Sequence, residues 1–220
     1  MKAVKTLRAD LNFERYDNHE GVQISHGYDA SFTWQRPNGA NTVLGVSRDF
    51  DRLTSNFATF AGAIRPGVFE WNTYKATYIS STTGTKLGGS LGVEGGGYYG
   101  GRRQTLKAVL NVVPSNTLLI ETTYTRNQLQ LPGLKDASSN VIGARVSYSF
   151  SPDLFVKAFA QMNDERKLAS LNLLLWYIYR PGSDLYVVYN QGWDQNLPDL
   201  PFLRSRQKSL TVKMTWWWSR

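Results

Sequence analysis

The sequence contains no cysteine, and this absence excludes disulfide bonds, thiolate chemistry and cysteine-ligated zinc. It has only two histidines, His19 and His26, and neither lies in a cluster of metal-ligating residues, so we expect no metal site and no cofactor. No stretch approaches the roughly 18 consecutive apolar residues that a membrane helix needs, and the mean hydropathy is −0.37. A helical membrane protein is therefore excluded. A membrane protein built of strands is not, because such strands are apolar only at alternate positions.

Enzymatic and nucleic-acid-binding functions also find little support. No arrangement of Ser, His and Asp stands out, and the acidic pair Asp164-Glu165 sits beside Arg166 and Lys167 in a segment typical of a solvated loop. The formal net charge is +8, but the basic residues are spread along the chain and form no run. We therefore expect a protein that is not an enzyme and has no nucleic-acid partner.

The glycine-rich stretch 95–103 resembles a phosphate-binding loop in composition only. It reads GGGYYGGRR, and nothing after it has the pattern of a helix. A phosphate loop needs a helix N-terminus to hold the anion. The stretch therefore predicts a glycine-rich strand that enters a hairpin.

The clearest structural pattern is a hairpin over residues 168–193. In its first arm, every odd position of 169–179 is apolar or aromatic, which is the period of two that a β-strand imposes. Pro181 and Gly182 then reverse the chain, because Pro fixes φ and Gly accepts a positive φ. The second arm resumes the alternation from Leu185.

The same alternation recurs along the chain, and no 3.6-residue period persists long enough to compete. It predicts an all-β protein of one domain over residues 1–220. The expected fold is an antiparallel up-and-down meander of about twelve strands, forming an outer-membrane-type β-barrel or the C-terminal part of a larger one. The expected strands span residues 5–16, 22–34, 41–50, 70–80, 87–98, 103–113, 117–127, 141–150, 154–163, the two arms of 168–193, and 208–218.

The expected connections differ in length between the two ends of the sheet. Tight turns follow the second, fourth, sixth, eighth and tenth strands. The long connections, over residues 51–69, 129–140 and 194–207, all fall on the other end. This asymmetry is typical of outer-membrane barrels, which have short periplasmic turns and longer external loops. Strands of roughly 9–13 residues also suit a tilted membrane crossing.

Two sets of side chains are the candidate functional residues. Charged residues that alternate with the apolar positions are expected to share the opposite face, as a polar, net-positive lumen or, more simply, as a solvated sheet face. These are Lys75, Glu94, Lys107, Glu121, Arg145, Lys157 and Lys213. Aromatic residues near the tight-turn end are expected to face outward at the level of lipid headgroups, which suits Trp and Tyr. These are Tyr177, Tyr179, Trp216 and Trp218.

Several stretches, in their order and spacing, resemble a known family. They are Ile64-Arg65-Pro66-Gly67-Val68, Tyr98-Tyr99-Gly100-Gly101-Arg102-Arg103, Tyr148-Ser149-Phe150-Ser151-Pro152, Tyr179-Arg180-Pro181-Gly182-Ser183-Asp184-Leu185, Val188-Tyr189-Asn190 and residues 208–215. Together they resemble the C-terminal barrel region of a bacterial outer-membrane family without an established function, whose N-terminal part is a family-9-like carbohydrate-binding module. The resemblance is strongest from about residue 64 onward. It implies location in the bacterial outer membrane, with outer-membrane lipid and the barrel-assembly machinery as partners, and it carries over no catalytic residue.

The chain departs from that family pattern at both ends. The carbohydrate-binding-like module is absent, so its glycan-binding role does not transfer, although such an upstream domain would be a further partner. The start, MKAVKTLRADLNFERYD, lacks the apolar region of a signal peptide, so we expect a fragment without its upstream signal peptide and periplasmic module. At the other end, Trp218 takes the place of the terminal aromatic of a barrel-assembly signal, with two residues after it.

Two functions stay open from the sequence. The first is an outer-membrane β-barrel that acts as a membrane scaffold, pore or export conduit, with no catalysis of its own. For an open channel, the excess of Lys and Arg among the expected lumen residues predicts a preference for anions. The second is a soluble β-sheet domain that binds glycan through exposed Trp and Tyr. Dependence on detergent separates the two.

Overall fold

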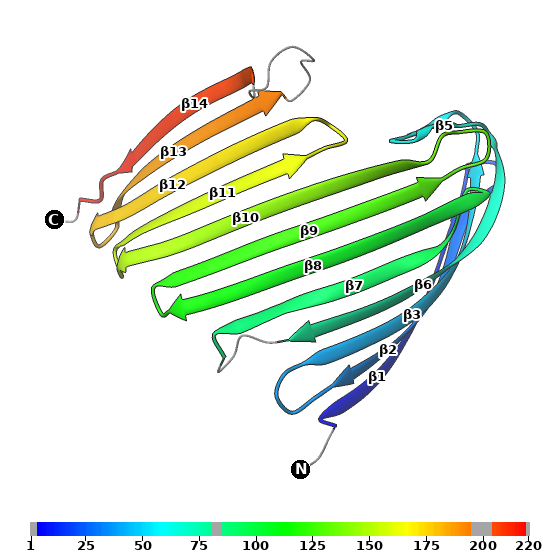
Figure 1. Cartoon of the computed structure of the whole chain (residues 1–220), viewed down its shortest axis with the longest axis horizontal. Helices are drawn as coiled ribbons and strands as arrows, with labels where there is room; N and C mark the ends of the chain where they lie inside the picture. The colour runs from blue at the N-terminus through cyan, green and yellow to red at the C-terminus, as the bar shows by residue number, and fades with distance from the viewer. Residues whose placement is uncertain (1–3, 81–84, 195–203, 219–220) are drawn as a thin grey trace. The chain divides into compact units, whose positions relative to one another are not determined.

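The computed structural model describes residues 4–80, 85–194 and 204–218. In these ranges, twelve strands form one antiparallel sheet in the order β1-β2-β3-β6-β7-β8-β9-β10-β11-β12-β13-β14, and β4 and β5 form a small second sheet (Figure 1). Each strand of the large sheet pairs with its neighbours in sequence, once the β4–β5 insertion is set aside. The predicted all-β meander of about twelve strands is confirmed. No helix in the described ranges is long and apolar enough to span a membrane.

The strands of the large sheet are 10 to 15 residues long. Their bounds are β1 (Thr6–Asp17), β2 (Gln23–Gln35), β3 (Asn41–Leu53), β6 (Gly67–Ser80), β7 (Leu87–Tyr98), β8 (Gly101–Ser115), β9 (Leu118–Gln130), β10 (Ala137–Ser151), β11 (Leu154–Asn163), β12 (Leu168–Arg180), β13 (Ser183–Asp194) and β14 (Arg204–Thr215). The small sheet pairs β4 (Phe57–Thr59) with β5 (Gly62–Ile64).

The connections are shorter than the alternation predicted. Pairing of β3 with β6 continues to Leu53 and Gly67, and the 51–69 connection contains the β4–β5 hairpin, which the sequence pattern did not reveal. The expected 129–140 connection shrinks to residues 131–136, because β9 and β10 both extend past their last apolar alternation. Of the 194–207 connection, residues 195–203 lie outside the described ranges. Below, "loop end" means the end of the sheet that bears these connections, and "turn end" means the opposite end.

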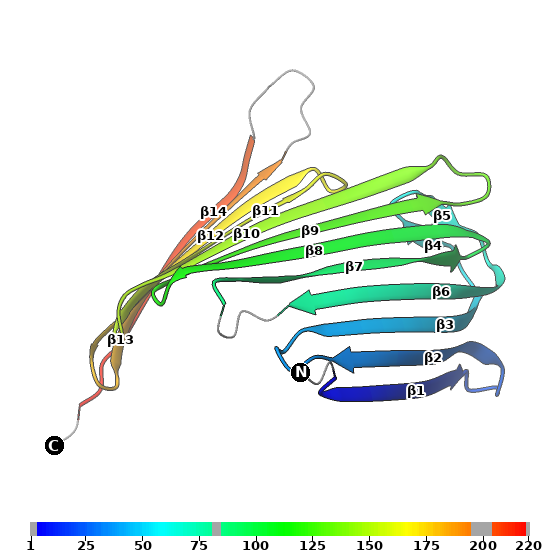
Figure 2. The same cartoon turned by 60° about the horizontal axis from the view of Figure 1, so that its bottom comes forward.

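The described residues divide into two compact units, which we treat separately. Unit 1 contains residues 4–80, 89–108 and 125–139. Unit 2 contains residues 85–88, 109–124, 140–194 and 204–218. Figure 2 shows the succession of strands from a second direction.

Strand register in unit 1 separates two faces. One row of directly paired residues crosses five strands as Leu11, Ala30, Val46, Tyr74 and Gly95. Because successive side chains of a strand point to opposite faces, the adjacent row lies on the other face. That row reads Asn12, Asp29, Ser47, Thr73 and Gly96. We call the first the apolar face and the second the polar face.

Unit 2 shows the same separation. Its apolar face carries the row Val146, Ala158, Leu173, Tyr189 and Leu210 across β10 to β14. The adjacent row, Ser147, Lys157, Leu174, Val188 and Thr211, lies on its polar face. The polar face of this unit is therefore mixed, since Leu174 and Val188 interrupt its hydrophilic residues.

The turns follow the residue types that the sequence supplies. Gly182 has φ 77°, as expected for the reversal between β12 and β13. Tyr99 and Gly100 form the two-residue turn from β7 to β8, with φ values of 45° and 79°. Two consecutive positive φ values are those of a type I′ hairpin turn. The glycine-rich stretch 95–103 thus enters a hairpin and no helix follows it, as predicted.

Buried apolar side chains of unit 1 gather at one place, at the loop end. Ile64, Tyr99, Leu129 and Leu131 are each 9% exposed or less. Partly buried Phe69, Trp71 and Tyr98, which belong to the polar face, pack against them, as do Leu53, Phe60, Ala61 and Leu134. The β4–β5 hairpin therefore covers the polar face at this end, beside the ends of β7, β8 and β9 (Figure 2).

Candidate functional site

The apolar face of unit 1 is open to its surroundings. Eleven of its large side chains are 42% to 86% exposed, with Val46 and Leu11 at the two extremes. They are Leu7, Leu11, Phe13, Tyr28, Phe32, Leu44, Val46, Tyr74, Tyr78, Leu91 and Val93. Monomeric soluble proteins seldom expose a continuous apolar surface larger than a few hundred Å². An exposed apolar surface of this kind marks a site of contact with a membrane, a ligand or another protein.

The apolar face of unit 2 has the same character. Ile142, Val146, Tyr148 and Phe150 alternate along β10, and Leu210, Val212 and Met214 alternate along β14. All seven are between 39% and 66% exposed. Among the described residues of this unit, no large apolar side chain is buried, so the apolar residues do not form an interior.

Within the strands of unit 1, the charged residues of the apolar face gather at its loop end, whereas Arg36, just after β2, lies over the Trp34 and Tyr78 rings at the turn end. Those at the loop end are Arg15, Arg48, Arg52, Glu70, Arg102 and Arg126, within five residues of the strand ends nearest the loops. The guanidinium of Arg48 donates to Glu70 at 3.0 Å, and Arg15 pairs with Asp17 at 2.9 Å. This charged rim was not predicted from the sequence. The spacing of these residues could have revealed it. Each lies an even number of positions from the apolar residues of its own strand, and so on the same face.

All seven predicted charged residues lie on the polar face of their unit. In unit 1, Lys75 stands directly opposite Glu94, and its Nζ donates to Asp29 Oδ1 at 3.2 Å. Glu94 accepts from Arg103 at 2.6 Å, so these four side chains form two ion pairs on the same face. Lys107 has no ion pair among the described residues.

In unit 2 the remaining members are dispersed. Arg145 pairs with Glu121 at 3.3 Å. Lys157 lies 5.2 Å from the ring of Phe155, and Lys213 stands opposite Tyr186. The structure therefore places the seven on the expected side of each unit but does not bring them into one site.

The expected positive excess on this face does not hold in unit 1. The register adds acidic residues that the sequence interpretation left out, and in this unit they outnumber the basic ones. The acidic side chains of this face are Asp10, Glu14, Asp29, Asp49, Asp51 and Glu94, against Arg8, Lys75, Arg103 and Lys107. The sequence interpretation missed these acidic residues because it counted the charges of only some strands.

Three of the four predicted interface aromatics form a group at the turn end of unit 2. Tyr177 and Tyr179 lie on the apolar face, and the ring of Trp216 is 5.8 Å from that of Tyr179. The Tyr179 hydroxyl donates to the Thr215 carbonyl at 2.7 Å. Trp218 is 74% exposed and has no ring contact with another described residue.

This group predicts a fluorescence result. In lipid vesicles, brominated acyl chains should quench Trp216 and Trp218 in a protein whose other tryptophans are replaced by Phe. The reason is that both rings continue the apolar face, and indole rings partition at the headgroup level of a bilayer. Quenching by a water-soluble agent with no effect of brominated lipid would contradict the outward orientation.

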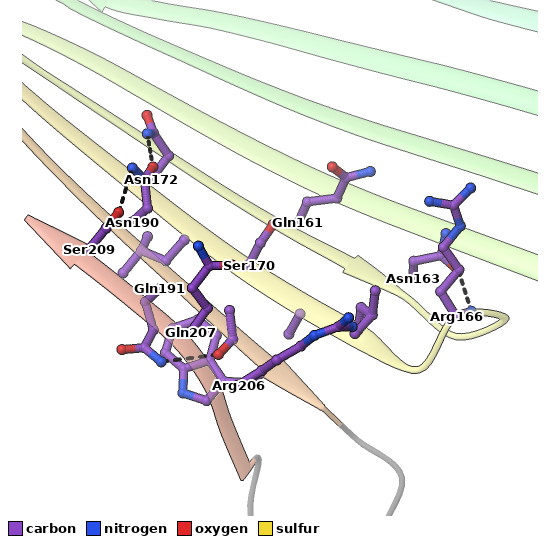
Figure 3. A pocket seen from close by; sticks show the side chains of 15 residues that line it. Gln161, Asn163, Arg166, Ser170, Asn172, Asn190, Gln191, Arg206, Gln207 and Ser209 are labelled. Carbon is purple, nitrogen blue, oxygen red and sulfur yellow. Dashed lines mark hydrogen bonds between the residues drawn. The ribbon is translucent and has the colours of Figure 1, made fainter.

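The side chains of unit 2 also line a groove on the polar face at its loop end (Figure 3). Asn172 donates to Asn190, and Asn190 donates to Ser209 at 3.2 Å, so amide groups link β12, β13 and β14. Gln161, Ser170 and Gln207 line the same groove and have no side-chain hydrogen bond to another described residue. Arg166 and Arg206 also line it, and Arg206 pairs with Asp194 at 3.6 Å. The groove offers mostly neutral donors and acceptors.

Tyr99 is the polar member of the buried cluster in unit 1. Its hydroxyl donates a short hydrogen bond to Asp51, and its ring lies 4.7 Å from that of Trp71. Burial, with the adjacent Asp51 carboxylate, raises the pKa of this phenol well above its usual value. Tyr99 therefore stays neutral and acts as a hydrogen-bond donor that fixes the β7–β8 turn to β3.

No group of three or more His, Asp or Glu side chains in the described part of the chain is placed to hold a metal ion. His26 stacks on Phe50 with ring centroids 4.9 Å apart. Asp164, at the β11–β12 turn, accepts from the Asn140 backbone and side-chain nitrogens, and these bonds lower the pKa of its carboxyl.

Comparison of the chain with protein-family models, with curated proteins and with solved structures found no match.

Proposed function

We propose that this protein is a membrane-embedded β-sheet protein of the outer-membrane type, which acts as a scaffold and has no catalysis of its own. The proposal includes closure of the meander into a barrel, lipid as the partner of the apolar face, and insertion by the barrel-assembly machinery. The resemblance of its motifs to the outer-membrane family described above supports the same assignment.

One observation carries the proposal. Apolar side chains point outward on the apolar face, and the buried apolar residues are few and gathered under one small hairpin. Moving one Leu, Val or Phe side chain from water into an apolar phase contributes about 1.5–3 kcal/mol. A chain that leaves whole rows of these residues exposed gives up this contribution in water and regains it in lipid.

The lengths of the strands and the residue types at the two ends of the apolar face are those expected for a sheet in lipid. A strand tilted by about 45° needs roughly 9–11 residues to cross a bilayer, and the strands of the large sheet have 10 to 15. At the loop end the apolar face passes into charged residues, and at the turn end it carries Tyr179 and Trp216. Both kinds of residue suit a membrane–water boundary.

A scaffold fits the polar face better than an open channel. The β4–β5 hairpin packs Ile64 over the polar-face residues Phe69, Trp71 and Leu129. The charges of that face are also engaged with one another, as in the Asp29–Lys75 pair at 3.2 Å and the Glu94–Arg103 pair at 2.6 Å. Ions would have to compete with these pairs and pass the hairpin.

Planar-bilayer recording tests the scaffold assignment. The intact protein should give little or no steady current, and replacement of residues 56–65 by a short Gly-Ser linker should increase conductance by exposing the polar face. Because acidic side chains outnumber basic ones there in unit 1, any current should not favour anions. Large, anion-selective current from the intact protein would contradict both expectations.

The proposed membrane location has a direct test. The protein folded in detergent should migrate differently on a denaturing gel before and after boiling, and it should float with lipid vesicles in a density gradient. A protein that is monodisperse without detergent and sediments free of vesicles would contradict the proposal.

The groove of unit 2 favours a second candidate function. Neutral amide and hydroxyl groups such as Gln161, Ser170 and Gln207, with Trp193 beside them, can bind the hydroxyls and the apolar face of a sugar ring. Binding of an oligosaccharide that is lost in a Gln161→Ala/Gln207→Ala variant, by a protein that needs no detergent, would favour this soluble function.

A further inference from the structure

The charged rim of unit 1 contains two arginines without a partner. Arg8, Arg15, Arg48 and Arg103 each form an ion pair within the unit. Arg102 and Arg126, in the part of the chain that the structure describes, form none and are both exposed. Arg52, at the end of β3, also lacks an ion pair, but its guanidinium donates to the Gln23 carbonyl at 3.1 Å.

The two arginines line one shallow groove on the apolar side of β8 and β9. Gln104, Gln128 and Gln130 share this groove and are exposed with them. The groove also contains Asp136, whose carboxylate accepts from Gln130 Nε2 at 2.8 Å. The groove thus keeps a positive excess, with amide donors on both strands.

The position of the groove indicates what it would meet. Arg102 and Gln104 precede Leu106 and Ala108 on the same face of β8, so the groove begins where the apolar residues end. In the membrane-embedded protein, this is the level of the lipid headgroups. A guanidinium there can donate two parallel hydrogen bonds to a phosphate, and it holds its charge at any physiological pH.

We propose that Arg102 and Arg126 bind the phosphate groups of anionic lipids at the loop end of the apolar face, with Gln104 and Gln128 donating to the same headgroups. The inference rests on the proposed function, because it needs the apolar face to lie in a bilayer. The ligand class of this groove is then anionic lipid. Its binding would set how deeply unit 1 lies in the membrane.

The test compares two double variants of the full chain. Arg102→Gln/Arg126→Gln removes the proposed site. Lys107→Gln/Lys157→Gln removes the same charge from the polar faces, and neither lysine has an ion pair in the described ranges. Binding of phosphatidylglycerol to each protein, folded in zwitterionic detergent, is counted by native mass spectrometry against phosphatidylcholine and against inorganic phosphate.

The arginine variant should bind phosphatidylglycerol roughly 25-fold more weakly than the wild type, because each basic residue at an anionic surface contributes about a factor of five. The lysine variant should bind it like the wild type. Equal losses in both variants, or no preference for phosphatidylglycerol over phosphatidylcholine, would overturn the inference. Equally tight binding of inorganic phosphate would overturn the assignment to lipid.

Two further measurements test the proposed function independently of lipid binding. Heat-modifiable mobility and flotation of each variant with phosphatidylcholine vesicles report membrane embedding whether or not anionic lipid binds. Failure of embedding in the wild type refutes the proposed function, whereas embedding without selective lipid binding refutes only the arginine site.

Discussion

Replacing Val46 by lysine should destabilise the folded protein in lipid vesicles by about 2–4 kcal/mol, the range for a charged side chain placed on the lipid face near the bilayer midplane. Val46 lies in the middle of β3 on the apolar face, between Ala30 and Tyr74 of the neighbouring strands. The free energy of unfolding, from urea titrations of vesicle-embedded protein, measures the effect.

The adjacent residue provides the control. Ser47→Lys introduces the same charge on the same strand but on the polar face, opposite Asp29 and Thr73. We expect a change within about 1 kcal/mol there, because the new ammonium group stays in water near carboxylates. If Val46→Lys is as harmless as Ser47→Lys, the apolar face is solvated and the membrane proposal fails. Surface substitutions of a soluble protein usually change stability by no more than about 0.5 kcal/mol.

Truncating Leu129 to alanine should lower the free energy of unfolding by about 2–5 kcal/mol, the usual range for a buried leucine. Leu129 is 1% exposed and packs in the cluster with Ile64, Tyr99 and Leu131. The loss should also loosen the β4–β5 hairpin, so proteolysis within residues 54–66 should become faster.

Leu119→Ala on the same strand is the matched control, since Leu119 is 39% exposed. We expect it to change the free energy of unfolding by less than about 1 kcal/mol. Equal effects of the two truncations would mean that the cluster does not stabilise the loop end, and the argument for a covered polar face would lose its basis.

The strands were predictable because period-two alternation is a local property. β7 and β11 begin and end at the residues expected from their alternation. β3 and β12 also begin, and β6 also ends, at the expected residue, and the remaining boundaries differ by one to four residues. Backbone pairing between strands extends beyond the residues whose side chains alternate. At the start of β6, for example, Gly67 still pairs with Leu53 of β3. The β4–β5 hairpin was missed because strands of three residues are too short to show a period.

The sequence predicted which face of the sheet each candidate residue occupies, but not which side chain it pairs with. Parity alone assigned Lys75 and Glu94 to the face that bears them. The ion pairs of Lys75 with Asp29 and of Glu94 with Arg103 depend on which strands are neighbours and in what register, and no local pattern contains that information. The rim arginines Arg102 and Arg126 were overlooked because they interrupt an apolar alternation instead of forming a motif.

The contact between the β12–β13 turn and the segment after β14 has a consequence for the order of folding. Ser183 is 1% exposed, and its hydroxyl accepts from the Trp217 backbone N–H at 2.9 Å. The Trp217 side chain lies so close to Gly182 that a Cβ there would meet it at 3.1 Å. This docking surface exists only once the Pro181-Gly182 reversal has formed. The hydrogen bond between Ser183 and Trp217 therefore forms only after this reversal, and a change that disrupts the reversal should also release the segment that follows β14.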